Sequence, residues 1–551
     1  MGLFAPSLGG GLQLLGVVVA IGIFYLISLI TYRRFFHPLA KFPGPFLNCI
    51  SPVPAGLSLL RGRFAFENKV YHEKYGSVFR LGPNELTFNT AQAYQDIYGF
   101  RPGHTNMRKS PIHTGPVQVG STTTVQYAVE DADHGRQRRA LSHSFSTQAL
   151  MEQEAIVQEY MTKFVMNFRR LAKEGKSFNI GDWFCYFTFD TMGDLSFGGS
   201  FGCLEHGKVG HVRKSVVRLT VNLGEYQEWV NYLFHTIKDG ALIQATRRIA
   251  GTGTWLQSFL QNRFQGMGNA LQYHLIHTKE KVTKRLQANQ IEHRDFIWYI
   301  LRQAEKFDLK YDEIVANSGL FIIAGSETTA TALSGLMARL IWNPNCYKQL
   351  ANEIRAAFAN EESITFNAVQ NLPYLNACIE EILRVHPPVP AGPPRVVPPG
   401  GDFVDGHWVP GGVTVSVGAW ASAHNAVHFR DPDAFIPERW IDPAYDSDVK
   451  KAMQPFSLGP RNCIGKNLAY MEMRVMIARL LWNFDVISVD GAPLWDPEGE
   501  MKHKQAFMVW EKSVVMVKVR DLRAHFEATI AVGSSELGVT SDIERDVPVE
   551  A

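Results

Sequence analysis

The longest uninterrupted run of apolar residues lies at the N-terminus. Leu12 to Ile30 carries no charge, and at the helical rise per residue it is about long enough to span a bilayer core. Arg33, Arg34 and Lys41 follow at once, and such positive charge marks the cytoplasmic side of a span. A secretory signal would have a basic start, a shorter apolar run and a small-residue cleavage site. We therefore expect a retained, single-pass membrane anchor over residues 1–32, with the remaining chain in the cytoplasm.

Proline and glycine mark the end of this anchor. Residues 41–45 read KFPGP, a stretch that stops a helix and sets the direction of the chain. Residues 33–45 are therefore predicted to form a basic hinge. Beyond it, Val78 to Phe88 alternates between apolar and polar residues around a Gly-Pro turn, which predicts a hairpin.

Helical periodicity dominates the middle of the chain. From about residue 135 to 385, apolar residues recur at spacings of three and four, a pattern typical of helices. From Pro388 to Trp420 the period is two, which predicts short strands, and a last helix is expected near Asn467 to Trp482. Residues 506–519 have the pattern of a strand. The predicted fold is mainly α with a minor β-sheet component, in one large domain over residues 46–522.

Composition and charge limit the possible partners. The 551 residues are 46% apolar and 12% aromatic, enough for a large core and an apolar pocket. The net charge of +2 offers no basic face for phosphates, so nucleic acid is excluded as a partner. After Phe526 the chain is acidic and has no aromatic residue, so residues 523–551 are predicted to be a disordered tail.

One of the six cysteines stands in an unusual loop. The cysteines are scattered without close pairs, so the chain has neither a disulfide framework nor a CxxC motif. Cys463, however, lies in PFSLGPRNCIG, residues 455–465. Glycines let such a loop wrap closely around a flat group, and the N-terminus of a following helix would stabilise a thiolate. A buried cysteine in a tight turn is the alternative.

The loop resembles that of a known family. Phe456, Gly459, Arg461, Cys463 and Gly465 form the pattern F-x-x-G-x-R-x-C-x-G, which is similar to the haem-binding loop of the cytochrome P450 monooxygenases. The resemblance implies haem b (heme b) as the cofactor, with Cys463 as the axial thiolate ligand of its iron. The other four residues are then part of the haem site.

A second family motif lies upstream, in an apolar helical segment. It reads AGSETT, Ala324 to Thr329. Ala324 and Gly325 would leave room for dioxygen, while Glu327 and Thr328 could deliver protons through ordered water. Thr328 is the predicted relay residue, with Glu327 as its acid. The alternative is a packing seam of small residues in which a hydroxyl bonds to its own helix backbone.

A third motif joins two parts of the chain. Glu381 and Arg384 lie one helical turn apart, and Arg439 follows in FIPERW. The resemblance implies that the three residues form a network that holds a helix to the loop before Cys463. Their expected role is structural.

The resemblance also implies partners for the two propionates of haem. A buried ring needs cations beside these carboxylates. Family position points to His134 and Arg138, one turn apart on a helix, to Arg395 in GPPR, and to Arg461.

The resemblance extends over residues 43 to 518. It includes HGRQRRALSHSFS, FDTMGDLSFG and AHNAVHFRDPDAFIPERW, which are similar to membrane-bound fungal members. It implies a monooxygenase that inserts one oxygen atom from O2 into an apolar organic substrate, on the endoplasmic reticulum membrane. Electrons would come from NADPH through a separate NADPH-cytochrome P450 reductase, and fungal secondary metabolite biosynthesis is expected by analogy.

Two alternatives stay open. One is a haem-thiolate isomerase or dehydratase that does not use O2, and the other is a non-enzymatic membrane haem-binding protein. Substrate contacts are expected in residues 100–127 and 221–264 and near Asn317 and Phe321. Four basic residues are expected to steer the reductase, namely Arg136, Arg139, Lys466 and Arg474.

Overall fold

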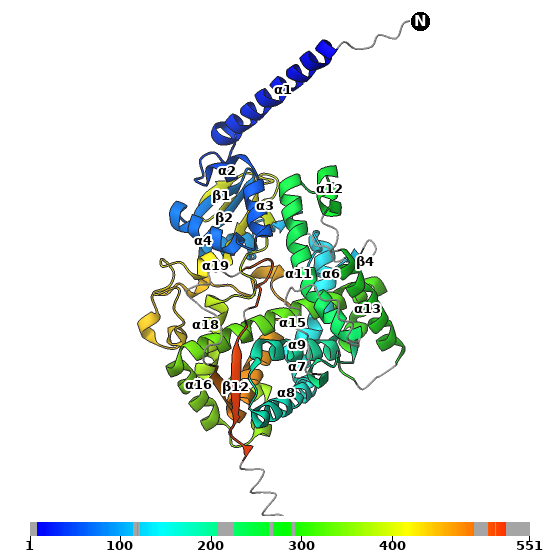
Figure 1. Ribbon diagram of the computed structural model, residues 1–551, viewed down its shortest axis with the longest axis vertical. Coiled ribbons are helices and arrows are strands. Elements are labelled where there is room, and N and C mark those ends of the chain that lie inside the picture. The colour runs from blue at the N-terminus through cyan, green and yellow to red at the C-terminus, as the bar shows by residue number, and fades with distance from the viewer. Residues whose placement is uncertain are drawn as a thin grey trace, which may run out of the picture.

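A long N-terminal helix projects from a mainly helical body (Figure 1). The computed structural model describes residues 8–113, 118–119, 122–206, 225–263, 268–288, 293–489, 505–512 and 514–524. Helix α1 (Leu8–Thr31) continues into a π-helix, η1 (Tyr32–Phe36). The stretch Leu12–Phe36 has a mean hydropathy of 2.6 and none of it is buried, so it has the length and surface of a membrane-crossing helix. The predicted tail lies outside the described residues from position 525 onward.

The predicted hinge is packed against the body. The backbone N–H of Arg80 donates to the Pro43 carbonyl at 2.7 Å, and its guanidinium donates to the Arg33 carbonyl at 2.7 Å. A Cβ on Gly44 would lie 2.6 Å from the Arg80 carbonyl oxygen, so only glycine allows this approach. Hydrogen bonds thus hold the end of the anchor to the first strand.

The larger sheet confirms the predicted hairpin. It has the order β1-β2-β10-β7-β3, in which β1 (Val78–Gly82) and β2 (Glu85–Phe88) are antiparallel. The predicted strands after Pro388 are also present, as β7 (Arg395–Val396), β8 (Asp402–Val404), β9 (His407–Val409) and β10 (Thr414–Val417). Strand β7 pairs with β3 (Arg108–Lys109). Two small elements, β4 (Gln118–Val119) and β5 (Thr122–Thr123), pair separately.

The second sheet corrects one strand prediction. Its order is β11-β12-β6, with β11 (Phe484–Ser488), β12 (Met516–Asp521) and β6 (Phe178–Asn179). Among the described residues between 506 and 519, only those from Met516 onward lie in a strand. Trp510 instead donates from its indole to the Pro387 carbonyl at 2.7 Å, because burying this large side chain is worth more than continuing the ladder.

Helices form most of the body. They are α2 (Phe46–Ile50), α3 (Val53–Leu60), α4 (Phe64–Tyr75), α5 (Ala91–Tyr98), α6 (Asp131–Ser142), α7 (Thr147–Glu152), α8 (Glu154–Glu174), α9 (Ile180–Phe197), α10 (Cys203–His206), α11 (Glu225–Ala250), α12 (Trp255–Arg263), α13 (Gly268–Gln287), α14 (Phe296–Ala304), α15 (Tyr311–Trp342), α16 (Pro344–Ala357), α17 (Phe366–Val369), α18 (Pro373–Val385), α19 (Ala419–Ala423) and α20 (Lys466–Asn483). Helix α15 crosses the centre of the body (Figure 1) and is apolar, but most of it is buried. It is a core helix that packs against α9, α18 and α20.

Candidate functional site

The loop before α20 is closed by its own backbone. The N–H of Cys463 donates to the Phe456 carbonyl at 2.9 Å. Gly459 has a φ of 69°, and a Cβ there would lie 2.1 Å from the Tyr98 carbonyl oxygen. Glycine is therefore required at this position, both for the backbone angle and for the contact with the end of α5. Gly465 is the N-cap of α20, so the helix begins just after the cysteine.

The Cys463 sulfur is open on one side. Its side chain is exposed, yet burial raises the pKa of the thiol, so protein atoms surround the sulfur without covering it. The backbone amide of Gly465 and the charges of Arg138 and Lys466 act in the opposite direction and lower this pKa. Burial outweighs these groups, so the net shift favours the thiol, while the amide and the two cations would stabilise the thiolate that forms when the sulfur binds a metal.

Two buried cations face each other on the larger sheet. Lys109 of β3 is the direct cross-strand partner of Arg395 of β7, and their exposed fractions are 4% and 2%. Like charges at such positions destabilise a sheet. Burial lowers the pKa of Arg395 to about 10 and that of Lys109 well below its ordinary value. Arg395 Nη1 is buried and has no hydrogen-bond partner among the residues that the structure describes.

The other predicted propionate partners lie around this pair. His134 is buried on α6, and burial together with the nearby Arg461 and Lys109 lowers its pKa to about 3. Arg138, also on α6, donates to the carbonyl and side-chain oxygens of Asn462 at 2.6 and 2.8 Å. Arg138 therefore fixes the position of Asn462, the residue directly before Cys463.

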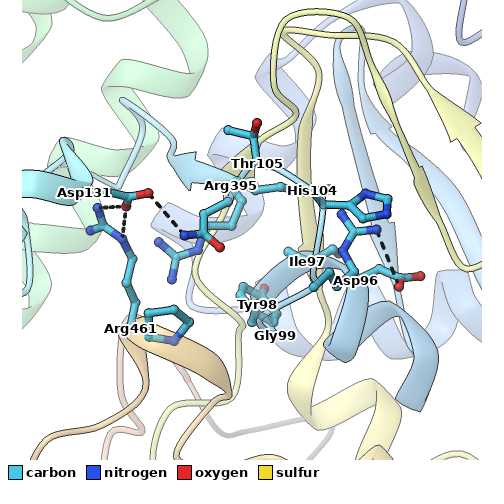
Figure 2. A pocket seen from close by; sticks show the side chains of 13 residues that line it. Asp96, Ile97, Tyr98, Gly99, His104, Thr105, Asp131, Arg395 and Arg461 are labelled. Atoms are coloured by element: carbon cyan, nitrogen blue, oxygen red, sulfur yellow. Dashed lines mark hydrogen bonds and ion pairs between the residues drawn. The ribbon is translucent and has the colours of Figure 1, made fainter. Parts of the chain in front are cut away.

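Arg461 is bonded to protein groups. It donates to the carbonyls of Ala128 and Val129 at 2.5 and 2.8 Å and to Asp131 at 2.8 Å. Figure 2 shows Arg395 between this ion pair and the end of α5 at Tyr98. These residues line a pocket beside the cysteine loop.

The cation cluster fits a doubly anionic group. We define it as Lys109, Arg138, Arg395 and Arg461, of which only Arg461 is paired with a carboxylate in the described part of the chain. Uncompensated buried charge is costly, so a ligand with two carboxylates beside the open sulfur would stabilise the arrangement. The two propionates of haem meet this need. Lys109 was not predicted, because the register of β3 on β7 alone reveals it.

The AGSETT motif lies in the middle of α15. Ala324 is exposed although most of this helix is buried, and the Thr328 hydroxyl donates to the Ala324 carbonyl at 2.6 Å. Gly325 has a packing role that the sequence did not indicate. A Cβ there would lie 2.7 Å from Met192 of α9, so this glycine makes room for a neighbouring helix.

Glu327 has a partner that the sequence did not indicate. The carboxylate is buried, and its Oε1 lies 2.6 Å from Nζ of Lys512. Its other oxygen, Oε2, is buried and has no hydrogen-bond partner in the described part of the chain. The available signal was weak: Glu511 and Lys512 interrupt an otherwise apolar run.

Glu381, Arg384 and Arg439 meet in the interior. Their side chains are 0% exposed. Arg384 donates to both Glu381 oxygens at 2.9 and 2.7 Å, Arg439 lies 3.4 Å from Oε1, and the Trp440 indole donates to Oε2 at 3.0 Å. Arg439 also pairs with Asp448. This network joins α18 to the segment that precedes the cysteine loop.

Two residues expected near the substrate lie in internal packing. Asn317 accepts the Val125 backbone N–H at 2.9 Å, and Phe321 packs edge to face on Phe145 and Phe296. Residues 114–117, 120–121 and 207–224, within or beside the other expected substrate segments, lie outside the described residues. Of the expected reductase contacts, Arg136 is paired with Glu313 and Asp133, whereas Lys466 is exposed.

Comparison with known proteins agrees with this geometry. Residues 54–514 match the Cytochrome P450 family. The cytochrome P450 monooxygenase aba2 of Botryotinia fuckeliana is 40% identical over 508 residues, which cover 90% of this chain and 93% of the relative. The monooxygenases ABA2 of Pyricularia oryzae and astJ of Aspergillus oryzae are 40% and 38% identical, over 87% and 89% of this chain and 90% and 93% of the relatives. A chain matched over most of its length in this way belongs to the cytochrome P450 family of haem monooxygenases.

Proposed function

We propose that this protein uses NADPH and O2 to insert one oxygen atom into an apolar organic substrate, in fungal secondary metabolite biosynthesis. The observation that carries the proposal is the open Cys463 sulfur, with an amide donor behind it and the cation cluster beside it. Bound haem supplies the activation of dioxygen. The protein's residues hold this group, exclude water and deliver protons.

Each part of the site has a role in holding the cofactor. Cys463 supplies the thiolate ligand, and the Gly465 amide stabilises its negative charge. Arg395, Lys109 and Arg138 offer positive charge to the propionates, and neutral His134 offers a ring N–H. Arg461 fixes the position of Asp131 and the start of α6 through its hydrogen bonds.

Protons reach the reacting oxygen through α15. Glu327 Oε2 has no partner and can exchange a proton, and the Thr328 hydroxyl can accept one proton while donating another. Its present bond to the Ala324 carbonyl keeps it oriented within the helix. Replacing Thr328 with Ala should therefore leave NADPH oxidation running while product per NADPH falls.

The partner that supplies electrons is a membrane-bound NADPH-cytochrome P450 reductase. The exposed Lys466 stands just after the cysteine loop, where a positive charge would attract an acidic partner. Helix α1 anchors the protein in the endoplasmic reticulum membrane. Helices α2, α3 and α12 lie at the end of the body nearest α1 (Figure 1). Each carries an exposed apolar side chain, namely Phe46, Leu57 and Trp255, which supports contact of this end with the same membrane.

The decisive experiment is a carbon monoxide spectrum of the reduced protein. We expect the red-shifted absorption of a thiolate-ligated haem, and its loss in Cys463→Ala. A histidine-type spectrum, or an unaltered spectrum in the variant, would overturn the assignment of Cys463. Product formation without NADPH or reductase would instead indicate an isomerase or dehydratase.

A further inference from the structure

Lys512 reaches the acid of the proposed proton relay from a distant part of the chain. Its Nζ lies 2.6 Å from Glu327 Oε1 and 3.2 Å from the Sγ of Cys185. Glu327 lies on α15, Cys185 on α9, and Lys512 on the segment before β12. The exposed fractions of the Lys512 and Glu327 side chains are 16% and 6%.

The segment that carries Lys512 is held on both sides. Before it, the Trp510 indole donates to the Pro387 carbonyl at 2.7 Å, and its ring stacks on His386 at 4.7 Å. After it, the backbone of Val515 exchanges hydrogen bonds with Asn179 and Ile180, at 2.9 and 3.0 Å. The backbone before and after Lys512 is therefore fixed by hydrogen bonds, which limits the positions that the lysine side chain can take.

The positive charge of Lys512 is balanced by the negative charge of Glu327. Burial raises the pKa of Cys185 to about 12, so the group remains a thiol. Burial lowers the pKa of Lys512, but the ion pair with Glu327 and the hydrogen bond to the Cys185 sulfur raise it, and the net shift is upward. Asp182, one turn before Cys185 on α9, also acts on that thiol. The result is an ammonium beside the Glu327 carboxylate, and the ammonium also donates to the sulfur of the neutral Cys185 thiol.

The two carboxylate oxygens of Glu327 have different surroundings. Oε1 is bound by the ammonium, while Oε2 is buried and has no hydrogen-bond partner within the described ranges. A buried carboxylate without a cation becomes neutral, and a carboxylate bound at one oxygen cannot rotate freely. We propose that Lys512 is a positioning residue that keeps Glu327 ionised and directs Oε2 toward the proton path. This inference rests on the proposed monooxygenase function.

The test compares variants of the full-length, haem-bound protein. Lys512→Met removes the charge, Lys512→Gln removes it but keeps a donor, and Lys512→Arg keeps it. Lys518→Met is the matched control, since Lys518 is exposed on β12 of the same segment. Glu327→Gln identifies the infrared bands of the Glu327 carboxyl group by difference.

The first readout is infrared absorption at neutral pH. We expect an ionised carboxylate in the parent protein, in Lys512→Arg and in the control, and a protonated carboxyl in Lys512→Met and Lys512→Gln. An ionised carboxylate in both neutral variants would overturn the proposal. If the methionine variant fails to accumulate, the glutamine variant gives the same comparison.

The second readout is product formed per NADPH consumed. We expect Lys512→Met to lose about tenfold, as Glu327→Gln does, and Lys512→Arg to restore it. Normal coupling in Glu327→Gln would remove the relay from the proposed function, while the infrared result would still decide whether Lys512 sets the charge of Glu327. Loss of coupling in Glu327→Gln with full coupling in Lys512→Met would overturn the positioning role alone.

Discussion

Two groups of buried charges in this protein are built in opposite ways. In the network of Glu381, Arg384 and Arg439, every charge has a partner within hydrogen-bonding distance. In the cation cluster, Lys109 and Arg395 stand opposite each other on neighbouring strands, and Arg395 Nη1 has no partner. The charges of the first group are all paired with one another or with neighbouring residues, so this group can have a purely structural role. In the second, Lys109 and Arg395 have no carboxylate partner among the described residues, which supports the proposal that it binds an anion.

The sharpest way to break the paired group is Glu381→Gln. Two buried guanidinium groups would lose their shared carboxylate, which costs about 3–5 kcal/mol in unfolding free energy. Urea unfolding followed by tryptophan fluorescence measures this loss. Glu362→Gln, an exposed glutamate, is the control and should be near neutral. Equal unfolding free energies of the two variants would show that the network does not stabilise the fold.

Arg395→Met tests the unpaired group. Removing a buried charge that faces Lys109 should leave the haem-free protein at least as stable as before, whereas haem loses one propionate contact. We expect haem binding to weaken by about 2 kcal/mol, or some 30-fold. Haem titration followed by absorption measures it. A fall in haem-free stability as large as that of Glu381→Gln would contradict the distinction between the groups.

The smallest effect concerns pH and His134. Its pKa of about 3 in the folded protein lies below the ordinary value of about 6.5. Between these values the unfolded chain binds a proton that the folded protein does not. Stability therefore falls as pH is lowered through this window, by up to about 1.4 kcal/mol per pH unit for this one group.

His134→Gln should remove this single proton from the pH dependence. Urea unfolding of the haem-free protein at pH 6.5 and 4.5 gives the two slopes. The buried His72, His113 and His274 have lowered pKa values too, so the variant should retain most of the dependence. An unchanged slope would show that His134 is already charged among the cations.

Local pattern was enough where the interacting residues are neighbours in the chain. The hairpin at Val78–Phe88 and the last helix follow from periodicity and turn residues. The pattern around Cys463 predicted the family because the residues that set the shape of this loop, its glycines above all, lie within a few positions of one another. The strand expected before Met516 failed because a distant contact of Trp510 outweighed local propensity.

The sequence by itself determined the class of protein, and it predicted a membrane anchor and the role of the cysteine loop. Tertiary structure alone decided that Lys109 faces Arg395, that Lys512 holds Glu327, and that Gly325 makes room for α9. These contacts join segments far apart in the chain. They depend on strand register and helix packing, and no periodicity or short motif encodes which distant residue will arrive at a given position.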